Sequence, residues 1–98
     1  MSHALTLDPE RTALVVVDVQ ERINGVMADD RHLPRIAALV EGARILDLPV
    51  LTTEQYPKGL GATVGSLADR LPSAPLEKMT FSCARENHVQ QALDALER

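Results

Sequence analysis

The most informative segment for the fold class is Thr12-Ala13-Leu14-Val15-Val16-Val17-Asp18. Its apolar run is continuous and rich in valine, which is typical of a parallel strand that is covered on both faces. A strand with one face in water would alternate apolar and polar residues instead. We therefore expect a buried, central strand over residues 12–18, with the carboxylate of Asp18 at its carboxyl end.

Apolar spacing predicts the elements that follow this strand. Residues 21–30 are polar and include Gly25, which indicates a loop. A three- and four-residue spacing then predicts an amphipathic helix from Leu33 to Leu46, ended by Pro49, and residues 49–53 form a second strand. Residues 54–65 are rich in glycine and indicate a loop, followed by a short helix over 64–71. Residues 77–82 are expected to be extended, and a last helix contains Val89, Ala92, Leu93 and Leu96.

The alternation of strands and helices predicts an α/β fold with a parallel sheet and right-handed crossovers. The elements amount to one half of a doubly wound sheet, on one side of the first strand. One edge of that strand then has no partner within residues 1–98. An unpaired edge with such a sequence invites pairing with another chain.

Composition and charge exclude several classes of function. The chain of 98 residues suffices for one small domain, and its formal charge of −4 includes no basic stripe, so we expect no nucleic acid partner. It contains no apolar stretch of the ~20 residues that span a bilayer, and no secretory signal. Cys83 is the single cysteine, so an internal disulfide is impossible. These features indicate a cytoplasmic protein without a membrane partner.

Asp18 and Lys78 are the candidate catalytic residues. Ligands of open α/β sheets bind beyond the carboxyl ends of the strands, where Asp18 lies. Taken singly, Asp18 equally suits a turn or a helix cap, and Lys78 suits a solvated surface position better. Together they suit the activation of a cysteine thiol, because a carboxylate can take its proton and an ammonium can stabilise the thiolate.

Three segments resemble the isochorismatase-like hydrolases. Residues 12–20 resemble the opening strand of that family, and Glu77-Lys78-Met79-Thr80-Phe81-Ser82 resembles its lysine motif. Residues 48–61, which include the run Thr53-Glu54-Gln55-Tyr56-Pro57-Lys58-Gly59-Leu60-Gly61, resemble the second strand and following loop of one branch, the YcaC-related and isochorismatase-domain-containing proteins. The segments occur in family order, and the resemblance extends from about Leu5 onward.

The resemblance implies a three-layer α/β/α, Rossmann-like fold with a six-stranded parallel sheet, of which residues 1–98 are the N-terminal part. It implies an Asp-Lys-Cys triad in which Asp18 is the base and Lys78 is the second member. The family's cysteine follows a further strand, which should begin where this sequence ends at Arg98. We therefore expect the 98-residue chain to be inactive alone, and Cys83 to be an unreactive, partly buried cysteine.

By resemblance, Gln20, Gln55 and Tyr56 line a substrate pocket; hydrogen bonding within loops is an equally good interpretation. Phe81 is either a pocket wall or, preferably, part of the core. Nicotinamidase relatives hold a metal after the second strand, but residues 53–58 contain no histidine. His3, His32 and His88 lack metal-ligand spacing, so we expect no metal and no cofactor.

The sequence thus predicts a cysteine hydrolase of small-molecule amides or related C–N bonds, which we expect to be a homo-oligomer. The alternative is an inactive short form or pseudoenzyme that binds partners through an open sheet edge. A flavodoxin-like nucleotide binder would share the fold class, but no GxxxxGK[ST] phosphate loop occurs.

Overall fold

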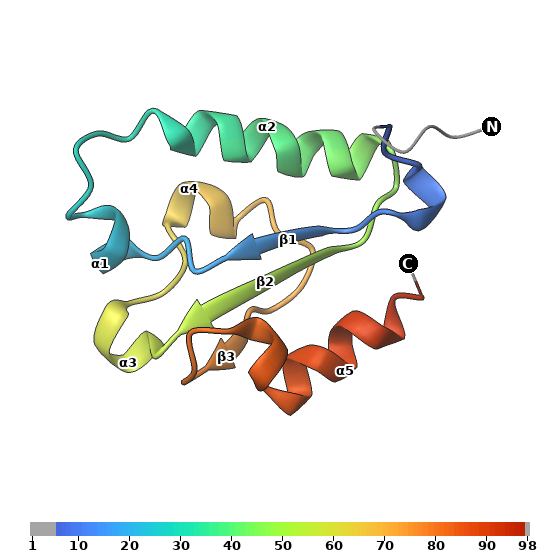
Figure 1. The fold of residues 1–98 in the computed structure, drawn as a ribbon. Coiled ribbons are helices and arrows are strands. Elements are labelled where there is room, and N and C mark those ends of the chain that lie inside the picture. The colour runs from blue at the N-terminus through green and yellow to red at the C-terminus, as the bar shows by residue number, and fades with distance from the viewer. Residues whose placement is uncertain (1–5, 98) are drawn as a thin grey trace.

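A parallel three-stranded sheet is the centre of the molecule (Figure 1). The computed structural model describes residues 6–97. The strands lie in the order β1 (Leu14–Val17), β2 (Val50–Gln55) and β3 (Leu76–Lys78). The helices within this range are α1 (Glu21–Asn24), α2 (His32–Ile45), α3 (Pro57–Leu60), α4 (Gly65–Ala68) and α5 (Asn87–Ala95), with 3-10 turns at Pro9–Arg11 and Cys83–Arg85.

Helices cover both faces of the sheet. Helices α2 and α4 lie on one side, and α5 lies on the other (Figure 1). The connections from β1 to β2 and from β2 to β3 step in the same direction, so right-handed crossovers place their helices on the same face. The result is the α/β/α arrangement that the sequence predicts.

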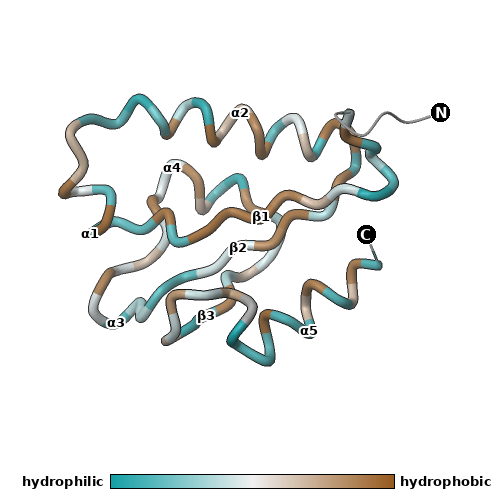
Figure 2. Tube along the Cα trace, in the orientation of Figure 1, coloured by the Kyte–Doolittle hydropathy of each residue, from teal (hydrophilic) through white to brown (hydrophobic). Residues whose placement is uncertain are grey.

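The core lies between α2 and the first two strands. Val16, Val40, Ala43 and Val50 form a buried cluster, against which five partly buried apolar side chains pack: Leu14, Val19, Ile36, Leu48 and Leu71. Figure 2 shows the hydrophobic colour along β1 and on turns of α2. The predicted helical spacing is confirmed, since Val40 and Ala43 are its buried members.

The first strand is an edge strand of this sheet, not a central one. It pairs with β2 only, in the register Leu14 to Val50 through Val17 to Thr53. Val16 is buried, whereas Val17 is 49% exposed. The expectation of a central strand is therefore wrong within residues 6–97, where β1 pairs with β2 alone, and the open edge of β1 is the one that the sequence predicts. The exposure of Val17 also shows that the strand is not fully covered on its faces.

Several predicted boundaries are wrong. Residues 21–30 contain helix α1, which ends where Gly25 caps it. Strand β2 continues to Gln55, two residues beyond the expected end. The segment 77–82 is extended only as far as Lys78, because the chain then turns so that two of its carbonyls accept hydrogen bonds from that lysine.

Candidate functional site

The carboxyl ends of the three strands bring the candidate catalytic residues together. Asp18 follows β1 directly, Gln55 ends β2, and Lys78 ends β3. The register places Gln55 opposite Lys78. Since all three strands are parallel, their polar ends meet at one edge of the sheet, which is where open α/β folds bind ligands.

Lys78 is buried, and oxygen atoms surround its ammonium group. Only 1% of the residue is exposed. Its Nζ donates to Asp18 Oδ2 at 2.8 Å and to Gln55 Oε1 at 2.7 Å. The carbonyl oxygens of Thr80 and Phe81 lie 3.1 and 3.2 Å from the same atom. An ammonium has three N–H donors, so four acceptors leave none of them free. The interpretation as a solvated surface lysine is wrong.

Asp18 receives a donor on each carboxylate oxygen. Oδ2 binds Lys78, and Oδ1 accepts from the Thr53 hydroxyl at 2.8 Å. Its side chain remains 20% exposed, so Asp18 is less deeply buried than Lys78. The backbone has φ 55°, a left-handed conformation that Asp and Asn tolerate better than most residues. Helix α1 begins after Gln20, so Asp18 does not cap it.

Thr53 is a member of the cluster that the sequence analysis missed. It is completely buried, and its hydroxyl fixes one oxygen of Asp18. Side chains two residues apart in a strand point to the same face. Thr53 therefore shares a face of β2 with Gln55, and this period of two is the signal that could have found it.

Gln20 and Gln55 brace the cluster. Gln20 is fully buried; its Oε1 accepts from the Gln55 N–H at 2.6 Å, and its Nε2 donates to the carbonyls of Gln55 and Gly61 at 3.0 and 2.7 Å. The Gln55 side chain also donates to the Met79 carbonyl at 2.9 Å. These are the loop hydrogen bonds of the alternative interpretation. A substrate-binding role for the two glutamines stays a prediction.

Two aromatic rings lie at the surface near the cluster. Tyr56 is 46% exposed and has φ 38° at the start of α3. Its ring covers Gly59, where an added Cβ would lie 2.3 Å from Tyr56 Cε2. Phe81 is 92% exposed, so the preferred interpretation of Phe81 as core is wrong. Its carbonyl oxygen, not its ring, contacts Lys78.

Glu86 holds the turn that follows β3. Its Oε1 accepts from the Met79 N–H at 2.8 Å, the Thr80 N–H at 2.9 Å and the Thr80 hydroxyl at 3.0 Å. The hydrogen bonds from Thr80 and Met79 hold the pKa of Glu86 below its ordinary value. A lowered carboxyl pKa stabilises the fold above the ordinary pKa, and that contribution is lost only as pH falls through the lowered pKa. The turn is therefore anchored at neutral pH.

Cys83 and the histidines lie outside this hydrogen-bonded cluster. Cys83 is a free, partly exposed thiol at the start of a 3-10 turn. His32 contacts Asn24 Oδ1, His88 contacts the Glu77 carbonyl, and His3 lies outside the described residues. Across residues 6–97, no three His, Cys, Asp or Glu side chains gather as metal ligands would, and no helix is long and apolar enough to cross a membrane.

The family model of the isochorismatase domain matches residues 12–98. The chain belongs to this family. Mouse isochorismatase domain-containing protein 2A is 40% identical over 75 residues, which are 76% of this chain and 36% of that protein. Among solved structures, the MAR1 ribonuclease of Caenorhabditis elegans is 34% identical and has a TM-score of 0.72. The match includes 90% of this chain and 47% of MAR1.

The fold also matches that of the YcaC protein of Escherichia coli, which is described as an octameric hydrolase of unknown specificity. That structure has a TM-score of 0.80 at 21% identity, and the match covers 100% of this chain and 51% of YcaC. The chain thus spans between about a third and a half of the length of these relatives. The isochorismatase fold accounts for the sheet and for the order of its elements.

The burial of Lys78 can be tested by acetylation, because the chain contains only one other lysine, Lys58, which is exposed. Acetylation of Lys78 requires local opening, so we expect it to be slower than that of Lys58 by on the order of 100-fold. Mass spectrometry of peptides after timed exposure to acetic anhydride measures both rates in one sample. Asp18→Asn should accelerate the acetylation of Lys78 and leave the acetylation rate of Lys58 unchanged. Equal acetylation rates of the two lysines in the unmodified chain would show that Lys78 is not buried.

Proposed function

We propose that the protein is a hydrolase of a small-molecule amide or related C–N bond. It acts through Asp18, Lys78 and a cysteine outside residues 1–98. The observation that supports this most is the contact of 2.8 Å between Lys78 Nζ and Asp18 Oδ2 at the carboxyl edge of the sheet. A cavity of about 230 Å³ adjoins Asp18, and Ile23 and Met27 contribute to its lining. Its apolar wall with one carboxylate suits a small substrate that has a polar group.

In the first half of the reaction, the carboxylate of Asp18 takes the proton of the cysteine thiol. The thiolate attacks the carbonyl carbon of the amide and forms a C–S bond. Asp18 then returns the proton to the leaving nitrogen as the C–N bond breaks. The products of this half are the amine and a thioester between the cysteine and the acyl group.

In the second half, Asp18 takes a proton from water as the water oxygen attacks the thioester carbon. The C–S bond breaks, and the proton passes to the departing sulfur, so the thiol and Asp18 return to their starting states. Lys78 keeps its proton throughout, since all its N–H groups already have acceptors. Its positive charge stabilises the nearby thiolate.

The four residues predicted to bind substrate differ in their exposure to solvent. Tyr56 and Phe81 present exposed rings, which suit apolar contact with a ligand. Gln20 and Gln55 are buried; Gln20 lines the cavity beside Asp18, and Gln55 accepts a hydrogen bond from Lys78. YcaC of Escherichia coli is described as an octamer, and we extend homo-oligomerisation to this protein as part of the proposal.

Thiol labelling of the native protein in which these residues occur tests the proposal. We expect one cysteine outside residues 1–98 to react rapidly with iodoacetamide at neutral pH. Because general-base catalysis contributes about 10²–10⁴-fold, Asp18→Asn should slow this labelling by about 100-fold. Lys78→Met should slow it as well. Ammonia release from a panel of primary amides should fall in parallel.

Two variants are matched controls for this experiment. Asp69→Asn removes an exposed carboxylate, and Cys83→Ser removes the thiol of the present chain; neither should alter the rates. Labelling or amide hydrolysis that depends on Cys83 alone would contradict the proposal. The panel includes a single-stranded RNA because MAR1 is named a ribonuclease. Cleavage of the RNA with every amide left intact would contradict the proposed substrate class.

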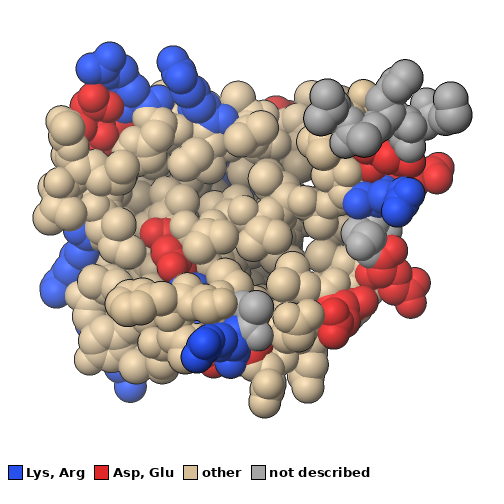
Figure 3. All heavy atoms as spheres, viewed as in Figure 1, with Lys and Arg blue, Asp and Glu red and all other residues tan. Residues whose placement is uncertain are grey.

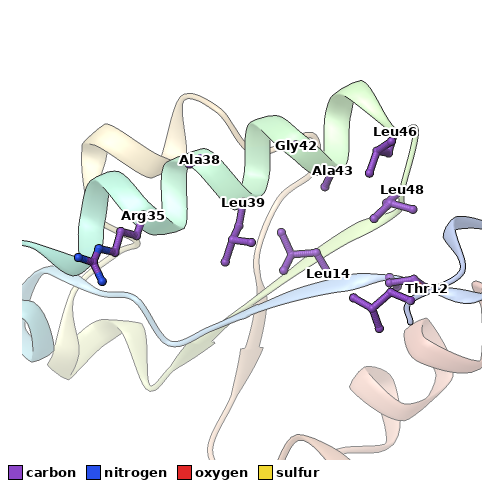
Figure 4. Close-up of a pocket in the computed structure, with 11 residues that line it drawn as sticks. Thr12, Leu14, Arg35, Ala38, Leu39, Gly42, Ala43, Leu46 and Leu48 are labelled. Atoms are coloured by element: carbon purple, nitrogen blue, oxygen red, sulfur yellow. The ribbon is translucent and has the colours of Figure 1, made fainter. Parts of the chain in front are cut away.

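A second candidate function is an interaction module, which the open edge of β1 favours. A groove of about 630 Å³ runs between α2 and β1, and Leu14, Leu39, Leu46 and Leu48 lie along it (Figure 4). Leu39 is 61% exposed and Leu46 is 58% exposed. Lysine and arginine side chains lie around the rim of the face seen in Figure 3 and do not cover its middle. An apolar face of this kind suits a protein partner or a second copy of the chain.

Size-exclusion chromatography of residues 1–98 at micromolar concentration tests this candidate. A chain that pairs through the groove should elute as a dimer or larger species, and Leu39→Glu should convert it to a monomer because it places a charge in the apolar contact. Met79→Glu is the control, since Met79 is equally exposed but lies away from the groove. A stable, well-folded monomer would contradict pairing through this edge.

A further inference from the structure

The turn after β3 supplies half of the oxygen atoms around the Lys78 ammonium. Thr80 and Phe81 contribute backbone carbonyls, whereas Asp18 and Gln55 contribute side chains. The position of a backbone carbonyl depends on the conformation of its turn, so the turn must be held in place for both carbonyls to contact the ammonium. Met79, Thr80 and Phe81 are all exposed, so side-chain packing does little to hold this turn.

We propose that Glu86 is a positioning residue for Lys78: its carboxylate fixes the turn of residues 79–81 and thereby holds the Thr80 and Phe81 carbonyls on the ammonium. Glu86 comes from outside the turn, at the position that precedes α5. Its Oε1 accepts hydrogen bonds from two consecutive backbone N–H groups and one hydroxyl, all within 3.0 Å. Bonds from N–H groups to a carboxylate are stronger than neutral ones.

The geometry places Glu86 one step away from the ammonium. It contacts neither Lys78 nor Asp18 through any hydrogen bond of the described residues, so its effect passes through the turn. Its side chain is 19% exposed, and its second oxygen lies 3.9 Å from His88 Nδ1. His88 in turn contacts the Glu77 carbonyl on β3. The start of α5 is therefore tied to both sides of Lys78.

The inference rests on the proposed function only for the catalytic role of Lys78. The position of the ammonium can be measured in residues 1–98 without any catalysis. In a proton–nitrogen NMR spectrum at low temperature and pH near 6, we expect one Nζ–Hζ signal from Lys78. Lys58 is exposed, so exchange with water removes its signal, and Lys58→Arg should leave the observed signal in place.

Glu86→Ala should broaden or abolish the Lys78 signal and accelerate acetylation of Lys78 relative to Lys58 by about tenfold, because three hydrogen bonds to the turn are lost. Glu86→Gln should restore most of the protection, since the amide oxygen can still accept from the turn. Thr80→Val removes the hydroxyl that contacts Glu86 Oε1 and the Ser82 carbonyl but leaves both backbone N–H groups on Glu86, so it should produce a smaller acceleration in the same direction.

Glu41→Ala is the matched control. Glu41 is also a hydrogen-bonded surface carboxylate, but its partner is Arg44 on α2. This variant should leave the Lys78 signal and the acetylation ratio unchanged. The proposal is overturned if Glu86→Ala and Thr80→Val both leave Lys78 protected, or if Glu41→Ala exposes Lys78 as much as Glu86→Ala does. Neither result depends on whether the protein hydrolyses amides, so failure here is separate from failure of the proposed function.

Discussion

The burial of one ammonium group constrains the rest of this structure. Removing an ion from water costs several kcal/mol in a real protein, and only a close counter-charge with further hydrogen bonds compensates for it. Lys78 has Asp18 as its counter-charge, and Gln55, Thr80 and Phe81 provide neutral oxygens. Each of these oxygens has to be held in place, which explains why so many polar side chains at this edge are buried.

Further residues hold in place the groups that contact the ammonium. Thr53 holds the Asp18 oxygen that does not bind Lys78, Gln20 holds the backbone of Gln55, and Glu86 holds the turn of residues 79–81. Thr53 comes from β2, Gln20 from the segment after β1, and Glu86 from the start of α5. The chemistry proposed for Asp18 and Lys78 thus depends on segments that are distant in sequence, and the parallel sheet is what brings them to one edge.

Local patterns in the sequence were sufficient to predict the strand that ends at Asp18, helix α2 and the α/β class. They also placed Asp18 at the end of a strand, whereas Lys78 was expected near the start of an extended segment over residues 77–82, and the resemblance joined the two residues into one site. The partners of Lys78 were harder to predict, because Thr80 and Phe81 act through backbone carbonyls that their side chains do not reveal. Phe81 was expected in the core on hydrophobicity alone, but the turn that serves Lys78 leaves its ring in solvent.

A double-mutant cycle on Asp18 and Lys78 measures whether the two residues form one buried unit. Urea unfolding of residues 1–98 would be measured for the unmodified chain, Asp18→Asn, Lys78→Met and the double variant; Asn retains the tolerance for left-handed backbone at position 18. Since a buried charge that loses its partner costs about 3–5 kcal/mol, we predict a coupling energy of about 1.5 kcal/mol or more. Single effects that add to within about 0.5 kcal/mol would contradict the account, because the two residues would then not form one buried unit.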